Sequence, residues 1–289
     1  MQEKQEECEI MHLFSFLFRI FADNMQILLA SAKIMNDRSA TKGDACQSKK
    51  VNVLPDVTLS TPAFGKEAES FARDMAQYST ETIAEMLGCS HQIAAQNRLR
   101  FMRFFEEMET LPAILAYHGQ AYKHLKAETL KAEDLQFAQQ KLWITSFLYG
   151  LLRPLDGILP YRMEGHVELP SGENQNMFGF WKGRLTDMLI ESVKGDGGIL
   201  IHLATEEYQH LFDWQRVRRE VHIIQPLFYV RKGNDLKMQA VWAKTCRGAM
   251  TRFIIENRIA IPEHLNTFSY EGFTYNPTLG EPDYPHFIK

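Results

Sequence analysis

LWITSFLYG, residues 142–150, is mostly apolar and rich in β-branched and aromatic side chains. This composition is typical of a buried β-strand. QILLAS (26–31) and GILIHLA (198–204) are further runs of the same kind, and AILAY (113–117) is a shorter candidate that ends at Gly119. These runs predict a buried sheet whose strands lie far apart in the sequence.

A hairpin is predicted further along the chain. VHIIQPLFYV (221–230) and LKMQAVWA (236–243) flank the tetrapeptide Lys232-Gly233-Asn234-Asp235. Gly, Asn and Asp between two apolar runs favour a tight turn, so we predict that the two runs pair as antiparallel strands.

Helical patterns fill the segments between the strands. Apolar side chains recur every three or four residues after Phe64. Ser79 or Thr80 can cap the next helix, which Gly88 ends, and Ser90 can cap a longer one whose apolar stripe includes Phe101, Phe104, Phe105 and Met108. Helices are expected over residues 64–75, 80–87, 91–108, 120–127, 132–141 and 246–259.

Strands interspersed with helices, together with one hairpin, predict an α/β (mixed α+β) fold. We expect a single domain over residues 25–289, in which helices surround a mixed sheet. Residues 1–24 are expected to be an extension outside this fold. Their apolar run (10–21) is only twelve residues long and contains Arg19, whereas a membrane-spanning helix needs about 20 apolar residues.

The composition restricts the classes of function. The 289 residues are 45% hydrophobic and 24% charged, as in an ordinary soluble protein. The four cysteines are far apart, which argues against a disulfide framework or a zinc knuckle and favours the cytoplasm. His202, Glu206 and His210 have the spacing of metal ligands on a helix, but the residues before them read as a strand, so we expect no metal site and no cofactor.

Positive charge is concentrated in one part of the chain. The net charge of the whole chain is −4, yet residues 214–258 contain ten basic and three acidic residues. Such an asymmetry predicts an anionic partner.

The helix expected over AKTCRGAMTRFIIENR (243–258) places Lys244, Arg247 and Arg258 opposite an apolar side, with Arg252 at the border. Gly248 beside Arg247 would let a backbone or a ligand approach closely. Two interpretations remain open. The basic side is either one wall of an anion-binding cleft or the solvated face of an amphipathic helix.

A second group of polar residues follows the strand at 142–150. Tyr149, Arg153, Asp156, Tyr161 and Arg162 lie in a loop stiffened by Gly and Pro residues, and Glu164 comes directly after it. Functional side chains are common in such loops. The alternative is a turn-rich connection with one Arg–Asp ion pair. Lys33, just after the strand at 26–31, is either a solvated charge or a third member of the same site.

These residues carry a resemblance to the YaaA family of bacterial peroxide stress resistance proteins, from about Met25 to Tyr275. The matching motifs are Ala30-Ser31-Ala32-Lys33, Leu148-Tyr149-Gly150-Leu151-Leu152-Arg153-Pro154-Leu155-Asp156, Pro160-Tyr161-Arg162, Leu203-Ala204-Thr205-Glu206-Glu207-Tyr208 and the run from Lys244 to Arg258. The first motif departs from the family's Ser-Pro-Ala-Lys.

The resemblance implies a role in resistance to hydrogen peroxide, through limitation of free intracellular iron, and binding of double-stranded DNA. It also implies a positively charged cleft and a helix-hairpin-helix element. The best candidate for that element here is the helix pair from about Gln120 to Gln140, whose connection Ala127-Glu128-Thr129-Leu130-Lys131 has no Gly-x-Gly.

Two hypotheses of function follow, and the first is our expectation. The protein would be a cytoplasmic stress protein that binds double-stranded DNA without base-specific readout and that does not enter a membrane. The DNA- or anion-binding residues would be Lys33, Arg153, Arg162, Lys244, Arg247 and Arg252.

The alternative is an enzyme that acts on a small phosphate-bearing or otherwise anionic ligand, because acids, bases and tyrosines occur together in these motifs. Its candidate catalytic residues would be Lys33, Asp156, Glu164, Glu207 and Lys244. A counter-interpretation is that the carboxylates only hold the arginines in place. The sequence contains no Cys or His cluster, so direct iron sequestration is not expected.

Overall fold

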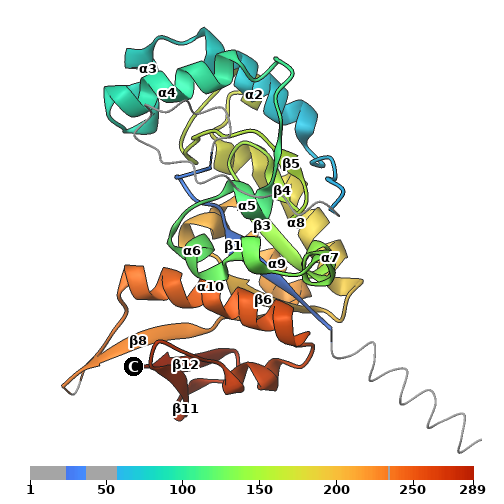
Figure 1. Ribbon diagram of the computed structural model, residues 1–289, viewed down its shortest axis with the longest axis vertical. Coiled ribbons are helices and arrows are strands. Elements are labelled where there is room, and N and C mark those ends of the chain that lie inside the picture. The colour runs from blue at the N-terminus through green and yellow to red at the C-terminus, as the bar shows by residue number, and fades with distance from the viewer. Residues whose placement is uncertain (1–23, 37–56, 234) are drawn as a thin grey trace, which may run out of the picture.

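The computed structural model describes residues 24–36, 57–233 and 235–289. Their fold is a mixed α/β arrangement with two five-stranded mixed sheets (Figure 1). The expected fold class is therefore confirmed, with two large sheets in place of one. The expectation for the extension at residues 1–24 falls, except for Asn24, outside the described ranges.

The first sheet has the strand order β4-β3-β1-β6-β7. β1 pairs in parallel with β3 and β6, β6 pairs in parallel with β7, and β3 pairs with β4 in the antiparallel direction. The strands predicted at 26–31, 142–150 and 198–204 are β1, β3 with β4, and β6. The bounds are β1 Met25–Ala30, β3 Leu142–Ser146, β4 Gly150–Leu152, β6 Ile199–Leu203 and β7 His222–Ile224.

The second sheet has the order β10-β11-β12-β8-β9, and β2 and β5 form a separate pair. The predicted hairpin is present, because β8 and β9 are antiparallel neighbours. The prediction that 221–230 is one strand was wrong. Gln225 and Pro226 interrupt the run, so that β7 joins the first sheet and β8 the second. The bounds are β2 Leu111–Pro112, β5 Gly157–Ile158, β8 Leu227–Lys232, β9 Asp235–Lys237, β10 Ser269–Tyr270, β11 Phe273–Glu281 and β12 Tyr284–Ile288.

Local signals placed the early helices well. Ser79 caps α3 through its side chain, Gly88 ends it in the left-handed conformation, and Ser90 caps α4. α4 ends at Met102, earlier than expected, and the chain then turns so that Phe104 packs against Tyr149. The bounds are α2 Gly65–Gln77, α3 Thr80–Leu87, α4 His91–Met102, α6 Gln120–Leu125, α7 Ala132–Lys141, α8 Met177–Lys194 and α9 Trp214–Glu220.

AILAY was predicted to be a strand, and this was wrong. Ala113–Ala116 form the short helix α5, whose four residues are all buried. Ala and Leu are strong helix formers, and burial alone does not distinguish a short helix from a strand. The predicted strand at 236–243 was also too long, because its second half begins a helix.

That helix is α10, Ala240–Asn257, which lies between the two sheets (Figure 1). Phe253 packs on Phe268 beside the second sheet, whereas Met250, Ile254 and Ile255 are buried in the core. Because α10 has neighbours on several sides, it is not an amphipathic surface helix with one solvated face. Gly248 packs against α6, and a Cβ at this position would lie 1.8 Å from the carbonyl oxygen of Ala121.

Candidate functional site

Polar side chains gather at one edge of the first sheet. β1, β3 and β6 run in parallel, so their carboxyl ends meet there. Ser31 and Lys33 follow β1, Phe147 follows β3, and Tyr208 comes shortly after β6. In α/β sheets this edge is the usual place for a ligand.

Three charged residues form a cluster around a buried carboxylate at this edge. The Lys33 Nζ lies 2.7 Å from Oε2 of Glu164, and the Arg162 Nη2 lies 3.1 Å from Oε1 of the same carboxylate. The side chain of Glu164 is 5% exposed, while that of Lys33 is 54% exposed. Glu164 therefore holds two cations in fixed positions, and the cluster keeps a net positive charge that faces outward through Lys33. This agrees with the interpretation that a carboxylate braces the cations.

A second anchor for Arg162 was not foreseen. The Asn97 side chain in α4 accepts a hydrogen bond from the Arg162 N–H (2.8 Å) and donates one to the Arg162 carbonyl (2.9 Å). Asn97 is 1% exposed and shares the buried stripe of α4 with Ala94 and Phe101. A polar residue on an otherwise apolar helical stripe is the signal that could have identified it.

Lys33 and Arg162 line a narrow pocket with a cavity volume of about 10 Å³, which is partly open to solvent. The Ser31 and Tyr208 hydroxyls lie 3.0 Å apart, and the Tyr161 hydroxyl lies 2.6 Å from Ser146 Oγ and 2.8 Å from the Tyr117 hydroxyl. Burial raises the pKa of Tyr161 to about 12 and also raises that of Tyr208, so both phenols are protonated at neutral pH. The pocket is lined by Ser31, Ala32, Lys33, Phe147, Tyr161, Arg162, Met163 and Tyr208.

α10 brings another cation to this end of the sheet. Arg247 lies near the end of β6. Burial lowers the pKa of Arg247, and the nearby Glu206 carboxylate opposes this effect in part. Burial also lowers the pKa of His202 in β6, and the Arg247 guanidinium lowers it further. Lys244 is exposed one turn earlier on α10, and Glu207 is exposed beside Tyr208. Lys33 and Arg162 thus reach the Glu164 carboxylate from distant parts of the chain, whereas Arg247 lies near His202 and Glu206.

Arg153 and Asp156 lie elsewhere, near the amino ends of β1 and β3. The Arg153 guanidinium stacks on Trp143 at 3.3 Å and donates to the Gln140 carbonyl. Burial lowers its pKa to about 10. The Asp156 carboxylate accepts hydrogen bonds of 2.7 Å from Ser60 Oγ and from the Arg153 backbone N–H, and burial raises its pKa. Both side chains have structural partners in this position.

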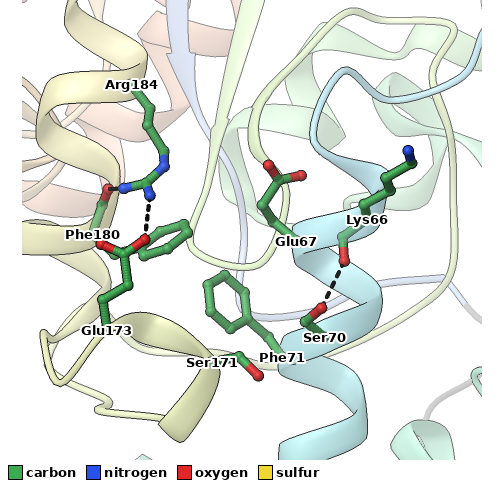
Figure 2. Close-up of a pocket in the computed structure, with 8 residues that line it drawn as sticks. All are labelled: Lys66, Glu67, Ser70, Phe71, Ser171, Glu173, Phe180 and Arg184. Carbon is green, nitrogen blue, oxygen red and sulfur yellow. Dashed lines mark hydrogen bonds and ion pairs between the residues drawn. The ribbon is translucent and has the colours of Figure 1, made fainter.

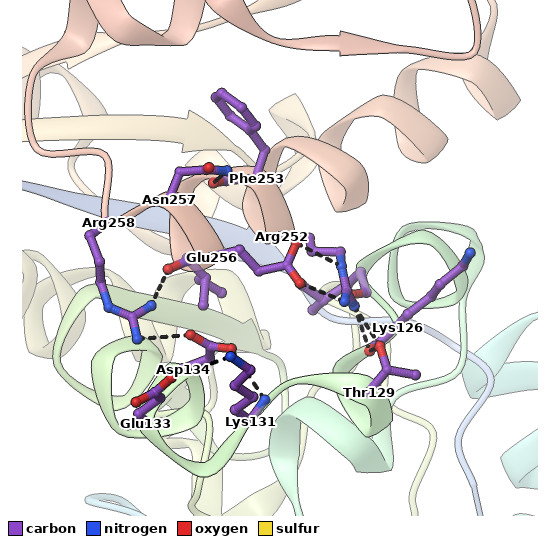
Figure 3. A network of polar contacts seen from close by, with 12 residues as sticks. Lys126, Thr129, Lys131, Glu133, Asp134, Arg252, Phe253, Glu256, Asn257 and Arg258 are labelled. Atoms are coloured by element: carbon purple, nitrogen blue, oxygen red, sulfur yellow. Dashed lines mark hydrogen bonds and ion pairs between the residues drawn. The ribbon is translucent and has the colours of Figure 1, made fainter.

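Arg252 is held within the fold as well (Figure 3). Its guanidinium donates to the carbonyls of Leu125 and Lys126, which end α6, and forms an ion pair with Glu256 (2.6 Å). It also donates to Thr129 Oγ1. Arg252 thus joins α10 to the connection between α6 and α7.

That connection is the candidate helix-hairpin-helix turn, and its backbone N–H groups are used locally. The Thr129 and Leu130 N–H groups donate to the carbonyls of Lys126 and Ala127, and the Lys131 N–H donates to the Asp134 carboxylate. Asp134 in turn pairs with Arg258 at 2.8 Å. The geometry of this turn serves packing against α10.

Arg252→Ala should therefore lower the stability of the protein. The substitution leaves two helix-terminal carbonyls without their charged donor, and we expect a loss of about 1–3 kcal/mol in the free energy of unfolding. Urea denaturation measures it, with Lys244→Ala, an exposed neighbour on α10, as the control that should stay near wild type. A stability for Arg252→Ala equal to that of the control would show that these bonds contribute nothing.

A second hollow lies between α2, the turn at Pro170–Gly172 and α8 (Figure 2). There Arg184 pairs with Glu173 at 2.5 Å and donates to the Phe180 carbonyl. None of the expected site residues lines this hollow. Its arginine is already neutralised, so it is a weaker candidate for an anion site.

The possible metal ligands remain apart. His202 is buried in β6, whereas Glu206 and His210 lie exposed in a following 3₁₀ segment, Glu206–Leu211. Within the described ranges, no group of three or more His, Cys, Asp or Glu side chains could hold a metal ion. In the same ranges no helix has the length and apolar character needed to span a membrane.

Comparison with known proteins found a matching family model and several similar sequences. The family model described as Peroxide stress protein YaaA matches residues 25–279. A UPF0246 protein of Phocaeicola vulgatus is 49% identical over 253 residues, which cover 87% of this chain and 94% of the relative. A UPF0246 protein of Bacteroides fragilis is 44% identical over 258 residues, 89% of this chain and 95% of the relative. A more distant one, of Hahella chejuensis, is 34% identical over 79% of the chain and 90% of the relative. The chain belongs to the YaaA family of peroxide stress proteins.

Proposed function

We propose that this protein acts in the peroxide stress response by binding the phosphates of double-stranded DNA at the edge of the first sheet. The observation that carries the proposal is the buried Glu164 carboxylate, which fixes Lys33 and Arg162 beside a pocket rich in hydroxyl groups. Fixed cations together with neutral hydroxyl donors suit a phosphate group. Contacts of this kind give binding that depends on salt and little on sequence.

Arg247 and Lys244 extend this positive surface along α10. Arg153 and Arg252, which we also expected to contact phosphate, support the fold from other positions. The α6–α7 pair is the candidate helix-hairpin-helix element. Because its N–H groups bond within the chain, we propose that it positions α10 and does not itself grip phosphate.

Lys33→Gln should weaken duplex binding several-fold and flatten its salt dependence. Each lost phosphate contact reduces the slope of log K against log salt by about 0.9. Fluorescence anisotropy with a labelled 30-base-pair duplex at four salt concentrations measures both quantities. Lys182→Gln, which removes an exposed cation from α8, is the matched control. Equal slopes for Lys33→Gln and the wild type would remove Lys33 from the contact.

A small phosphate-bearing ligand is the second candidate, and the enzyme interpretation depends on it. It is favoured by the recessed position of the hydroxyl groups of Ser31, Tyr161 and Tyr208, which a groove for a polymer would not need. Pyrophosphate or AMP would then raise the melting temperature of the wild type but not that of Lys33→Gln. Stabilisation by these compounds, without any duplex binding, would decide for the small ligand.

We also propose that the protein works in the cytoplasm and that its effect on free iron is indirect. Cys89 and Cys246 are free thiols, as expected in a reducing compartment. The described residues offer no cluster of iron ligands. Equilibrium dialysis against ferrous ions tests the second point, and stoichiometric retention of iron would contradict it.

A further inference from the structure

We propose that the β8–β9 hairpin is a basic arm that enters a groove of duplex DNA and forms a contact separate from the pocket. This inference rests on the proposed function, because it assumes that DNA is the partner. It assigns part of the positive charge of residues 214–258 to an element that carries none of the pocket residues.

The cations of this region fall into two groups. Arg216, Arg252 and Arg258 form ion pairs with carboxylates at 2.6–2.8 Å. By contrast, five exposed cations have no ion pair or side-chain hydrogen bond with any residue that the structure describes. They are Arg219, Arg231, Lys232, Lys237 and Lys244, of which Arg231, Lys232 and Lys237 lie on the hairpin.

The hairpin continues beyond the sheet as a narrow ribbon. β12 accompanies β8 only as far as Tyr229, after which Lys289 accepts one further bond from the Arg231 N–H. β9 is the edge strand, with β8 as its single neighbour in the sheet. Figure 1 shows β8 extending outward past the amino-terminal end of α10 toward the hairpin turn.

Both faces of this ribbon carry positive charge. Val230 pairs with Lys237, Arg231 with Leu236 and Lys232 with Asp235. Because side chains alternate along a strand, Lys232 and Lys237 project from one face and Arg231 from the other. Asp235 is the one acidic side chain among the described residues of the two strands.

This arrangement fits a DNA groove better than a flat anionic surface. The major groove of B-DNA admits a two-stranded β-ribbon, and phosphates line both of its walls. Cations on both faces let the ribbon meet phosphates on either side of it, whereas a membrane would meet only one face. Lys244, exposed near the start of α10, adds a cation on the side that leads back toward Arg247.

The test compares two variants with the same loss of charge. The arm variant is Arg231→Gln with Lys232→Gln and Lys237→Gln. The control variant is Lys66→Gln with Arg103→Gln and Lys182→Gln, all exposed and located on α2, α8 or at the end of α4. Binding to a labelled 30-base-pair duplex is measured by anisotropy from 50 to 200 mM salt. Binding to vesicles rich in phosphatidylserine is measured in parallel.

For the arm variant we expect at least a tenfold loss of duplex affinity at 100 mM salt and a salt slope flatter by about 2–3 units. The control should lose less than threefold. Duplex binding by the wild type that the arm variant retains would overturn the arm while leaving the proposed function intact. No duplex binding by the wild type would overturn the proposed function itself. Vesicle binding that is lost only in the arm variant, with duplex binding unchanged, would identify a membrane as the partner and overturn this inference.

Discussion

Among the helical glycines that the structure describes, Gly248 is the one at which alanine should destabilise the protein most. A Cβ at this position would lie 1.8 Å from the Ala121 carbonyl oxygen and 2.6 Å from its carbonyl carbon. These are backbone atoms of α6, so no side chain can rotate away, and α6 and α10 would have to separate. We expect a loss of about 3 kcal/mol in the free energy of unfolding, because overpacking against rigid backbone is costly.

Urea denaturation compares this variant with Gly183→Ala in α8. Gly183 is also inside a helix, but no atom lies within 4 Å of its added Cβ. Alanine there should stabilise the protein by about 0.5–1 kcal/mol, because glycine is a poor helix former. Opposite signs at the two glycines are the expected result. A Gly248→Ala protein as stable as the wild type would show that α6 and α10 do not approach this closely.

His202 should make the protein sensitive to acid. Its ring is 1% exposed in β6, and burial, with smaller effects from Arg247 and Arg218, lowers its pKa to about 3. An unfolded histidine takes up a proton near pH 6.5, so below that pH the unfolded state binds a proton that the native state does not. Stability is therefore lost as pH falls from about 6.5 toward 3, by about 1.4 kcal/mol per pH unit.

His202→Leu removes this titration and fills a similar volume. At pH 7.5 the variant should be at least as stable as the wild type, because neither ring nitrogen has a hydrogen bond of ordinary geometry to a described residue, and the nearby Gln225 side chain has only a small effect on the ring. At pH 4.5 its advantage over the wild type in the free energy of unfolding should be about 2–3 kcal/mol larger than at pH 7.5. Chemical denaturation at a series of pH values measures the difference, with the exposed His264→Leu as control. Parallel pH profiles for His202→Leu and the wild type would contradict a neutral buried imidazole.

Much of the fold could be predicted because the relevant signals are local. Ser79, Gly88 and Ser90 bond to backbone groups within a few residues, and these bonds fix where α3 and α4 begin or end. The apolar runs that became β1, β3 and β6 needed no knowledge of their neighbours to be recognised as buried. The sequence pattern was misleading where a short buried helix and a buried strand have the same apolar run, as in α5.

The candidate site could be predicted only in part. Arg153 and Arg162 are nine residues apart in the predicted loop, yet Arg153 stacks near the start of β3 while Arg162 reaches the pocket at the other end of this strand. Lys33 and Arg162 are distant in the sequence and meet at the Glu164 carboxylate, near the carboxyl ends of the parallel strands. The alternative of one solvated face does not describe α10, which is buried on several sides, and the anion-binding alternative stays a prediction.

The sequence by itself determined the family, the buried strands, the helix caps and the segment rich in basic residues. These depend on composition and on contacts between near neighbours. The tertiary structure alone decided which cations remain exposed and which bond within the fold. That choice depends on strand order and on the packing of α10 between two sheets, where each arginine bonds to whichever carbonyl, carboxylate or ring the long-range contacts place beside it.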